Sequence, residues 1–181
     1  MQIISPRVSV LEKDGVFSLV ILPTTDKRKL WLMFFWLFAW TVCGIIVFTN
    51  YFQITNKEAK VFIIVYLSFW AYYEFKIGRA FLWKKFGREK LWIKKGKIQY
   101  QREVSGKGKI QEFDLELVNG LEVIELSKSS FADTINQSFW IKGGERLQFN
   151  CQSKVIRFGM QLSDKEAYDV FKLLKNFLNK N

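Results

Sequence analysis

An uninterrupted apolar segment near the N-terminus limits the folds open to this chain more than any other feature. Residues 30–52 read LWLMFFWLFAWTVCGIIVFTNYF and contain no charged side chain. As a helix they would be about 35 Å long, whereas the hydrocarbon core of a bilayer is about 30 Å thick. We therefore expect a transmembrane helix over residues 30–52. A cleaved signal peptide is not expected, because the segment is too long and no small-residue cleavage site follows it.

A second apolar segment, residues 61–83, follows a polar connection that we expect to be an external loop, residues 53–60. The loop holds only Lys57 and Lys60, offset by Glu58. The other ends of the two segments are flanked by Lys27, Arg28, Lys29, Lys84, Lys85, Arg88 and Lys90. The positive-inside rule then predicts a multi-pass protein of the inner (cytoplasmic) membrane with both termini in the cytoplasm.

One carboxyl group lies inside the second segment. Glu74 is followed there by Lys76 and Arg79, and ionisable side chains at membrane depth are functional hypotheses by default. Two interpretations are open. The favoured one places Glu74 near the membrane surface, within reach of Lys76 or Arg79. The other is a buried polar contact with the first helix.

The strongest functional signal is a basic run behind the second segment. Its members are Lys84, Lys85, Arg88, Lys90, Lys94, Lys95 and Lys97, against the single acid Glu89. Such clusters just inside a span attract anionic lipids, with about 1 kcal/mol per residue near the surface. We therefore assign this run, with Lys27, Arg28 and Lys29, to contacts with the membrane surface. The competing interpretation is that these residues only set the topology.

From residue 84 onward, short alternating segments replace the continuous apolar pattern. Strands are predicted at residues 89–95, 97–104, 110–117, 121–126, 139–142, 145–151 and 154–162. About seven short strands at this spacing are typical of a small antiparallel sandwich or barrel. Ser163 and Glu166 form a capping box for a C-terminal helix. Its apolar stripe consists of Ala167, Phe171, Leu174 and Leu178, widened by Val170 and Phe177. We expect this stripe to cover the strands or, failing that, to bind a partner through Phe171, Leu174 and Leu178.

The first 29 residues carry a hairpin pattern of their own. Two alternating runs within residues 7–22 meet at Asp14-Gly15, a pair that favours a tight hairpin turn. A two-stranded hairpin alone is marginally stable in water. We therefore expect residues 1–29 to be cytoplasmic and their hairpin to pack on the domain formed by residues 84–181.

This order of elements resembles the bacterial pleckstrin-homology-like (PH-like) membrane proteins with an N-terminal two-helix hairpin. The resemblance rests on FGREKLWIKKGKI, residues 86–98, and RFGMQLSDKEAYDVFKLL, residues 157–174, and spans about residues 30–179. It implies an α+β membrane protein with a transmembrane hairpin and a cytoplasmic domain of about seven antiparallel strands closed by one helix. The functions of that family are mostly unassigned, and a fold does not dictate chemistry.

The resemblance also bears on lipid recognition. Phosphoinositide-binding PH domains carry a Lys followed by a basic-x-Arg triplet on the first two strands. In this chain the triplet position reads Tyr100-Gln101-Arg102, with Tyr in the first place. That departure argues against a specific inositol-phosphate pocket. It does not argue against a general attraction of the basic residues to anionic headgroups.

Composition narrows the remaining function classes. The chain of 181 residues has no His, and its two cysteines, Cys43 and Cys151, fall in different predicted compartments, so neither a metal, a cofactor nor a disulfide is expected. The net charge is +11, but the acids between Glu112 and Glu125 argue against nucleic acid. No arrangement of residues typical of a catalytic site is found.

We expect a membrane-anchored module that binds a protein partner, for example as a subunit or assembly factor of a larger membrane complex. The alternatives are an anionic-lipid sensor, a homo-oligomer and, less favoured, an enzyme.

Overall fold

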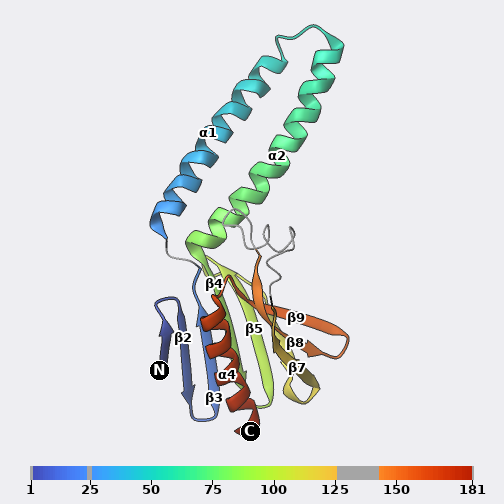
Figure 1. Cartoon of the computed structure of the whole chain (residues 1–181). Helices are drawn as coiled ribbons and strands as arrows, with labels where there is room; N and C mark the ends of the chain where they lie inside the picture. Colours follow the sequence, from blue (N-terminus) through green and yellow to red (C-terminus); the bar gives the residue numbers. More distant parts are fainter. Residues whose placement is uncertain (1, 24–25, 126–142, 181) are drawn as a thin grey trace. The chain divides into compact units, whose positions relative to one another are not determined.

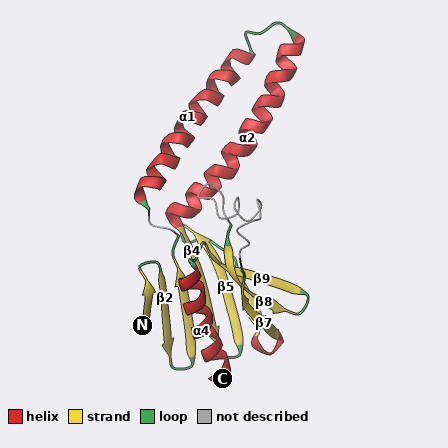
Figure 2. Cartoon of the chain, viewed as in Figure 1, coloured by secondary structure: helices red, strands yellow, loops and turns green. Residues whose placement is uncertain are grey.

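The computed structural model describes residues 2–23, 26–125 and 143–180 (Figures 1 and 2). The chain forms two compact units. The helical unit is Asp26–Leu82, and the sheet unit combines Met1–Thr25 with Trp83–Asn181. The strand expected at residues 139–142 lies outside the described ranges.

Two long helices make up the helical unit, α1 (Lys27–Tyr51) and α2 (Lys57–Phe86), and the last turn of α2 belongs to the sheet unit. By length and composition, both helices could cross a membrane. Helix α2 begins earlier than its apolar pattern because Asn56 caps it: Asn56 Oδ1 accepts hydrogen bonds from the backbone N–H groups of Glu58 and Ala59, at 2.9 and 3.4 Å. The expected loop of eight residues is therefore shorter.

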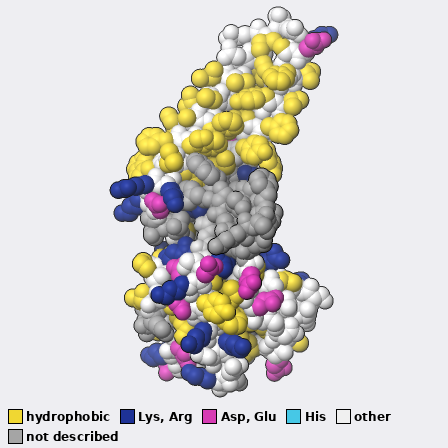
Figure 3. Space-filling model, in the orientation of Figure 1, with side chains coloured by type: hydrophobic (Ala, Val, Ile, Leu, Met, Phe, Trp, Pro, Cys, Tyr) yellow, Lys and Arg dark blue, Asp and Glu magenta, His cyan; other side chains and the backbone are white. Residues whose placement is uncertain are grey.

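The helices of this unit contact each other through few large side chains. Gly44 of α1 gives room to the indole of Trp70 on α2, since a Cβ at Gly44 would lie 2.1 Å from the Trp70 ring. Trp70 Nε1 donates a hydrogen bond to the Trp40 carbonyl oxygen at 3.0 Å. Figure 3 shows apolar side chains over most of the visible face of the helices, with charged side chains near their ends.

Nine strands and one helix form the described part of the sheet unit. The strands are β1 (Gln2–Ser5), β2 (Val8–Lys13), β3 (Val16–Ile21), β4 (Gly87–Lys94), β5 (Lys97–Val104), β6 (Ile110–Asp114), β7 (Val118–Val123), β8 (Glu145–Cys151) and β9 (Lys154–Met160). They build two antiparallel sheets, β1-β2-β3-β4-β5-β6 and β7-β8-β9. The 3₁₀ turn η1 (Leu115–Leu117) separates the sheets, and helix α4 (Asp164–Lys180) ends the unit.

The N-terminal strands are part of the larger sheet. Strand β3 pairs with β4, with Phe17 opposite Ile93 and Ile21 opposite Glu89. The expected packing of the hairpin on the later domain is therefore confirmed, and a third strand, β1, extends it. The turns Asp14-Gly15 and Lys95-Gly96 have positive φ at both residues, between 50° and 72°. This is the geometry of two-residue turns that match strand twist.

One hydrophobic core takes side chains from both sheets and from α4. Helix α4 buries Ala167, Val170, Leu174 and Phe177, and the Phe177 ring lies 5.3 Å from that of Phe17. The covering role expected of this helix is confirmed, and its four buried residues all belong to the predicted stripe. Leu174 is fully buried and so is not a partner surface, whereas Phe171 and Leu178 are only partly buried at the margin of the core.

Truncating Leu174 tests this packing. We expect Leu174→Ala to lower the free energy of unfolding by about 2–5 kcal/mol, because it removes a large side chain from a closed core. Tyr168→Ala is the matched control, since Tyr168 is on the same helix but 67% exposed. Denaturant unfolding of both variants in detergent makes the comparison. Equal losses in the two variants would contradict the observed orientation of α4.

Candidate functional site: a groove beside strand β1

The predicted membrane-contact residues do not form a single exposed cluster. Lys84 is only 4% exposed and donates a hydrogen bond to Gln161 Oε1 at 2.8 Å. Lys90 forms an ion pair with the buried carboxylate of Glu103 at 2.8 Å. Both lysines are thus engaged by protein groups, Lys84 from the last turn of α2 and Lys90 from the partly exposed face of β4.

Strand β4 also separates the remaining basic residues. Lys85 and Arg88 are exposed beside its first residue, Gly87. The exposed Lys94, Lys95 and Lys97 lie at its other end, about 23 Å away for an extended strand of this length. The N-terminal group, Lys27, Arg28 and Lys29, is exposed on the first turn of α1 in the helical unit.

The polar residues of the second helix follow the alternative interpretation. Glu74 Oε1 lies 2.8 Å from Thr41 Oγ1 on α1. Lys76 Nζ lies over the Tyr72 ring and the Arg79 guanidinium over the Phe75 ring, at 5.1 and 5.5 Å from the ring centres. The favoured ion pair with Lys76 or Arg79 is therefore replaced by a contact between the two helices.

The most buried charge of the sheet unit was not predicted. Glu89 is 2% exposed and accepts hydrogen bonds from Tyr100 Oη (2.6 Å), Arg102 Nε (2.9 Å), and the backbone N–H groups of Gly159 (3.0 Å) and Met160 (2.8 Å). Burial raises the pKa of Tyr100, and the Glu89 charge raises it further. Both Glu89 oxygens are thus satisfied, and the carboxylate joins β4 and β5 of one sheet to β9 of the other.

Arg102 extends this cluster instead of pointing to solvent. Its guanidinium contacts Glu145 Oε1 at 3.0 Å and donates to the Arg157 carbonyl oxygen at 2.9 Å. Burial alone would lower the pKa of Arg102, but the charge of Glu89 raises it. Arg102 is therefore engaged in a structural network. A sequence signal for this network existed, since Glu89 shares the period-2 face of β4 with Leu91 and Ile93.

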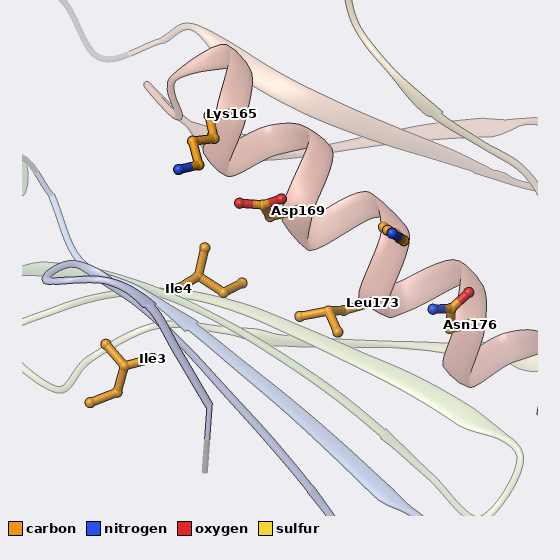
Figure 4. A pocket seen from close by; sticks show the side chains of 7 residues that line it. Ile3, Ile4, Lys165, Asp169, Leu173 and Asn176 are labelled. Atoms are coloured by element: carbon orange, nitrogen blue, oxygen red, sulfur yellow. The ribbon is translucent and has the colours of Figure 1, made fainter.

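An open groove lies between edge strand β1 and helix α4. Its volume is about 410 Å³, and its lining consists of Ile3, Ile4, Lys165, Asp169, Lys172, Leu173 and Asn176. Figure 4 shows Ile4 and Leu173 pointing toward each other across the groove, with Lys165 and Asp169 extending from the helix. The groove therefore has an apolar floor and a polar wall with two cations and one anion.

An ion pair holds the groove's two sides together at one end. Arg7, in the turn between β1 and β2, lies 3.4 Å from Glu166 on α4 and donates to the carbonyl oxygens of Met160 and Gln161. Glu166 also accepts from the Ser163 backbone N–H at 2.9 Å, which confirms the predicted capping box. Burial would raise the pKa of Glu166, but hydrogen bonds from Ser5 and Ser163 and the charge of Arg7 hold it below its usual value. The carboxylate is therefore ionised at neutral pH, where it stabilises this attachment.

Strand β1 borders the groove with an open edge. Within the described ranges β1 pairs only with β2, and Ile3 is 69% exposed. An edge strand presents unpaired backbone N–H and C=O groups that can pair with another strand. Backbone donors and acceptors, an apolar floor and a charged wall thus converge on one side of the sheet unit.

No metal centre competes with this groove among residues 2–23, 26–125 and 143–180, where no group of three His, Cys, Asp or Glu side chains could hold an ion. Comparisons with protein-family models, with curated proteins and with solved structures found no match, so the role of the groove is argued from its own geometry.

Proposed function

We propose that this protein is a membrane-anchored interaction module that holds an extended segment of a protein partner in the groove between β1 and α4. The observation that carries the proposal is the open edge of β1 directly beside the lined groove. Adding a strand to a sheet edge is a common way to bind peptides, since backbone hydrogen bonds give affinity and adjacent pockets give specificity. The partner segment would be a further strand next to β1.

Membrane insertion of the helical unit is supported by its surface. Large apolar side chains are exposed along both helices, among them Trp31, Phe35, Phe38, Phe62 and Phe69. Water-soluble monomers rarely expose apolar patches of such extent. The exposed Lys27, Arg28 and Lys29 favour an inner-membrane protein with both termini in the cytoplasm. We take the sheet unit as a PH-like domain because two antiparallel sheets end in one covering helix.

The chemistry of the groove favours an acidic, partly apolar partner segment. Lys165 and Lys172 outnumber Asp169 on the helical wall. Side chains of an added strand alternate between its two faces, so apolar residues on one face would reach Ile4 and Leu173. A second copy of this chain fits less well, because its own β1 has the sequence QIIS without an acid. A complex subunit or an assembly factor is the kind of protein that would use such a module.

Sensing of anionic lipids is the second candidate. The exposed Lys85 and Arg88 beside the start of β4 favour it. It ranks lower for two reasons. Lys84 and Lys90 have protein partners, and Lys94, Lys95 and Lys97 lie at the other end of β4, far from Lys85 and Arg88.

Charge reversal in the groove separates the two candidates. A displayed library of ten-residue peptides would be selected on full-length protein in nanodiscs. We expect enriched peptides to alternate apolar and acidic residues, and the pair Lys165→Glu/Lys172→Glu to weaken their binding at least about tenfold, since each altered contact is worth about 1 kcal/mol. The pair Lys85→Glu/Arg88→Glu changes the net charge equally outside the groove and should leave peptide binding unchanged.

The opposite pattern would contradict the proposal. If only Lys85→Glu/Arg88→Glu has an effect, and it lowers the amount of anionic lipid that copurifies with the protein, lipid sensing is the better account. Enrichment that is equal for acidic and basic peptides would also exclude the charge complementarity argued for this groove.

A further inference from the structure

The Thr41 hydroxyl lies at hydrogen-bonding distance from two oxygens, and both contacts cannot be hydrogen bonds if Glu74 is ionised. Thr41 Oγ1 lies 2.8 Å from Glu74 Oε1 and also 2.8 Å from the Leu37 carbonyl oxygen. A threonine hydroxyl has one proton to donate, whereas both neighbouring oxygens are acceptors when Glu74 is ionised. One of the two contacts then brings oxygen lone pairs together without a proton between them.

A proton on Glu74 resolves this conflict. The carboxylic acid O–H then donates to Thr41 Oγ1, and the Thr41 hydroxyl donates to the Leu37 carbonyl oxygen. Every oxygen in this short chain acts in a role that its chemistry allows, and both distances are normal for O–H···O hydrogen bonds. The Leu37 carbonyl oxygen, the last acceptor in this series, needs no further donor because α1 is helical there.

The other carboxyl oxygen points to the same protonation state. Glu74 Oε2 is buried and has no hydrogen-bond partner among the described residues. An unpaired oxygen of a neutral acid costs far less free energy than an unpaired buried carboxylate. The helix that packs against Glu74 provides no compensating cation, since α1 has no charged residue after Lys29.

The remaining titratable groups of the helical unit lie elsewhere. Lys76 and Arg79 contact the rings of Tyr72 and Phe75, and Cys43 and Tyr73 are exposed. Thr41 is eleven residues from each end of the apolar segment 30–52, which is about 16 Å of helix on either side. Its partner Glu74 is therefore at the level of the middle of α1, not near the membrane surface as the sequence favoured.

We propose that Glu74 is a proton-binding site in the middle of the membrane-spanning hairpin, with Thr41 Oγ1 as the acceptor of its proton and the Leu37 carbonyl oxygen as the acceptor of the Thr41 hydroxyl proton. This inference rests on the membrane insertion included in the proposed function, but not on peptide binding in the groove. Because the acid is the donor toward Thr41, loss of its proton would break either this hydrogen bond between α1 and α2 or the one from Thr41 to the Leu37 carbonyl oxygen. The α1–α2 hydrogen bond from Trp70 to the Trp40 carbonyl oxygen would remain. Packing of the two helices is thereby coupled to protonation.

Infrared spectroscopy of the full-length protein in liposomes tests the protonation state directly. At neutral pH we expect the difference between the wild type and Glu74→Gln to contain the C=O stretching band of a protonated carboxylic acid, shifted when H₂O is exchanged for D₂O. The matched variant is Glu58→Gln, because Glu58 is exposed at the start of the same helix. Its difference spectrum should contain carboxylate bands and those of the new Gln amide, without the acid band. The same pattern in the Glu74→Gln difference, with carboxylate bands in place of the acid band, would overturn the proposal.

A second variant keeps the test decisive if Glu74→Gln does not assemble. Thr41→Val preserves the shape of the side chain and leaves Glu74 in place but removes the acceptor of its O–H. The acid band should therefore remain and shift in frequency toward that of an acid without hydrogen bonds. An unchanged spectrum would contradict the assigned donor role. Extraction of the liposomes with alkaline carbonate checks insertion separately. Peptide binding measured on Glu74→Gln should be unaffected. A protein that binds no peptide but has the acid band would contradict only the groove proposal, and the opposite result would contradict only the proposal for Glu74.

Discussion

Replacing Glu89 by Ala is expected to lower the free energy of unfolding of the sheet unit by about 3–5 kcal/mol, the cost of removing one partner from a buried, hydrogen-bonded ion pair. Four groups would lose their acceptor together, among them the buried Tyr100 hydroxyl. The Arg102 guanidinium would be left partly buried beside an empty space, and the backbone N–H groups of Gly159 and Met160 would be buried without partners. The effect is large because the lost bonds connect different sheets.

Denaturant unfolding of full-length protein in detergent measures this loss. Glu112→Ala is the matched control: Glu112 also lies 3.6 Å from a cation, Lys97, but both side chains are about half exposed. Exposed pairs of this kind contribute about 0–1 kcal/mol. Glu89→Gln should be intermediate, because an amide keeps one acceptor but turns a donor toward Arg102 or the backbone N–H groups. Similar losses for Glu89→Ala and Glu112→Ala would show that the cluster does not stabilise the fold.

Deleting residues 2–22 should prevent the sheet unit from folding. This segment supplies Val8, Val10, Phe17, Leu19 and Ile21 to the core, all of them at most 3% exposed. Truncating one large buried side chain costs about 2–5 kcal/mol, and whole domains are stable by only about 5–15 kcal/mol. The deletion would also leave β4 as an exposed edge, a known route to aggregation.

Protease resistance of the sheet unit in the full-length protein reports the outcome. The deletion variant should be cleaved rapidly at sites within residues 87–160 that are protected in the intact chain. The single variants Phe17→Ala and Leu11→Ala calibrate the loss, since Phe17 is 1% and Leu11 42% exposed on neighbouring strands. Protection of the truncated chain equal to that of the intact chain would mean that β4–β9 and α4 fold alone. If they do not fold alone, a fragment that starts at Lys84 cannot replace the full-length protein in binding experiments.

Both predictions concern contacts between residues distant in sequence, and there sequence reasoning was weakest. Local patterns located the helices, the capping box at Ser163 and Glu166, the turn at Asp14-Gly15 and several strand boundaries, because each depends on neighbours within one turn or one hairpin. Strand β5 and β8 agree with the predicted residues 97–104 and 145–151. The N-terminal hairpin could also be assigned to the later domain, since two strands alone are marginal.

The apolar and charge patterns of the sequence by themselves determined the order of the elements. A segment of short strands comes first, two helices long enough to span a membrane follow, and further short strands and one helix end the chain. Which polar residues are buried, and against what, was decided by the tertiary structure. Alternation places Glu89 on the apolar face of β4, but only the packing of β9 brings the N–H groups of Gly159 and Met160, 70 and 71 residues away, to its carboxylate. The same packing gives Lys84 a partner in Gln161 and leaves the groove beside β1 open. The physical reason is that burial and pairing depend on distances between elements, which residue periodicity does not encode.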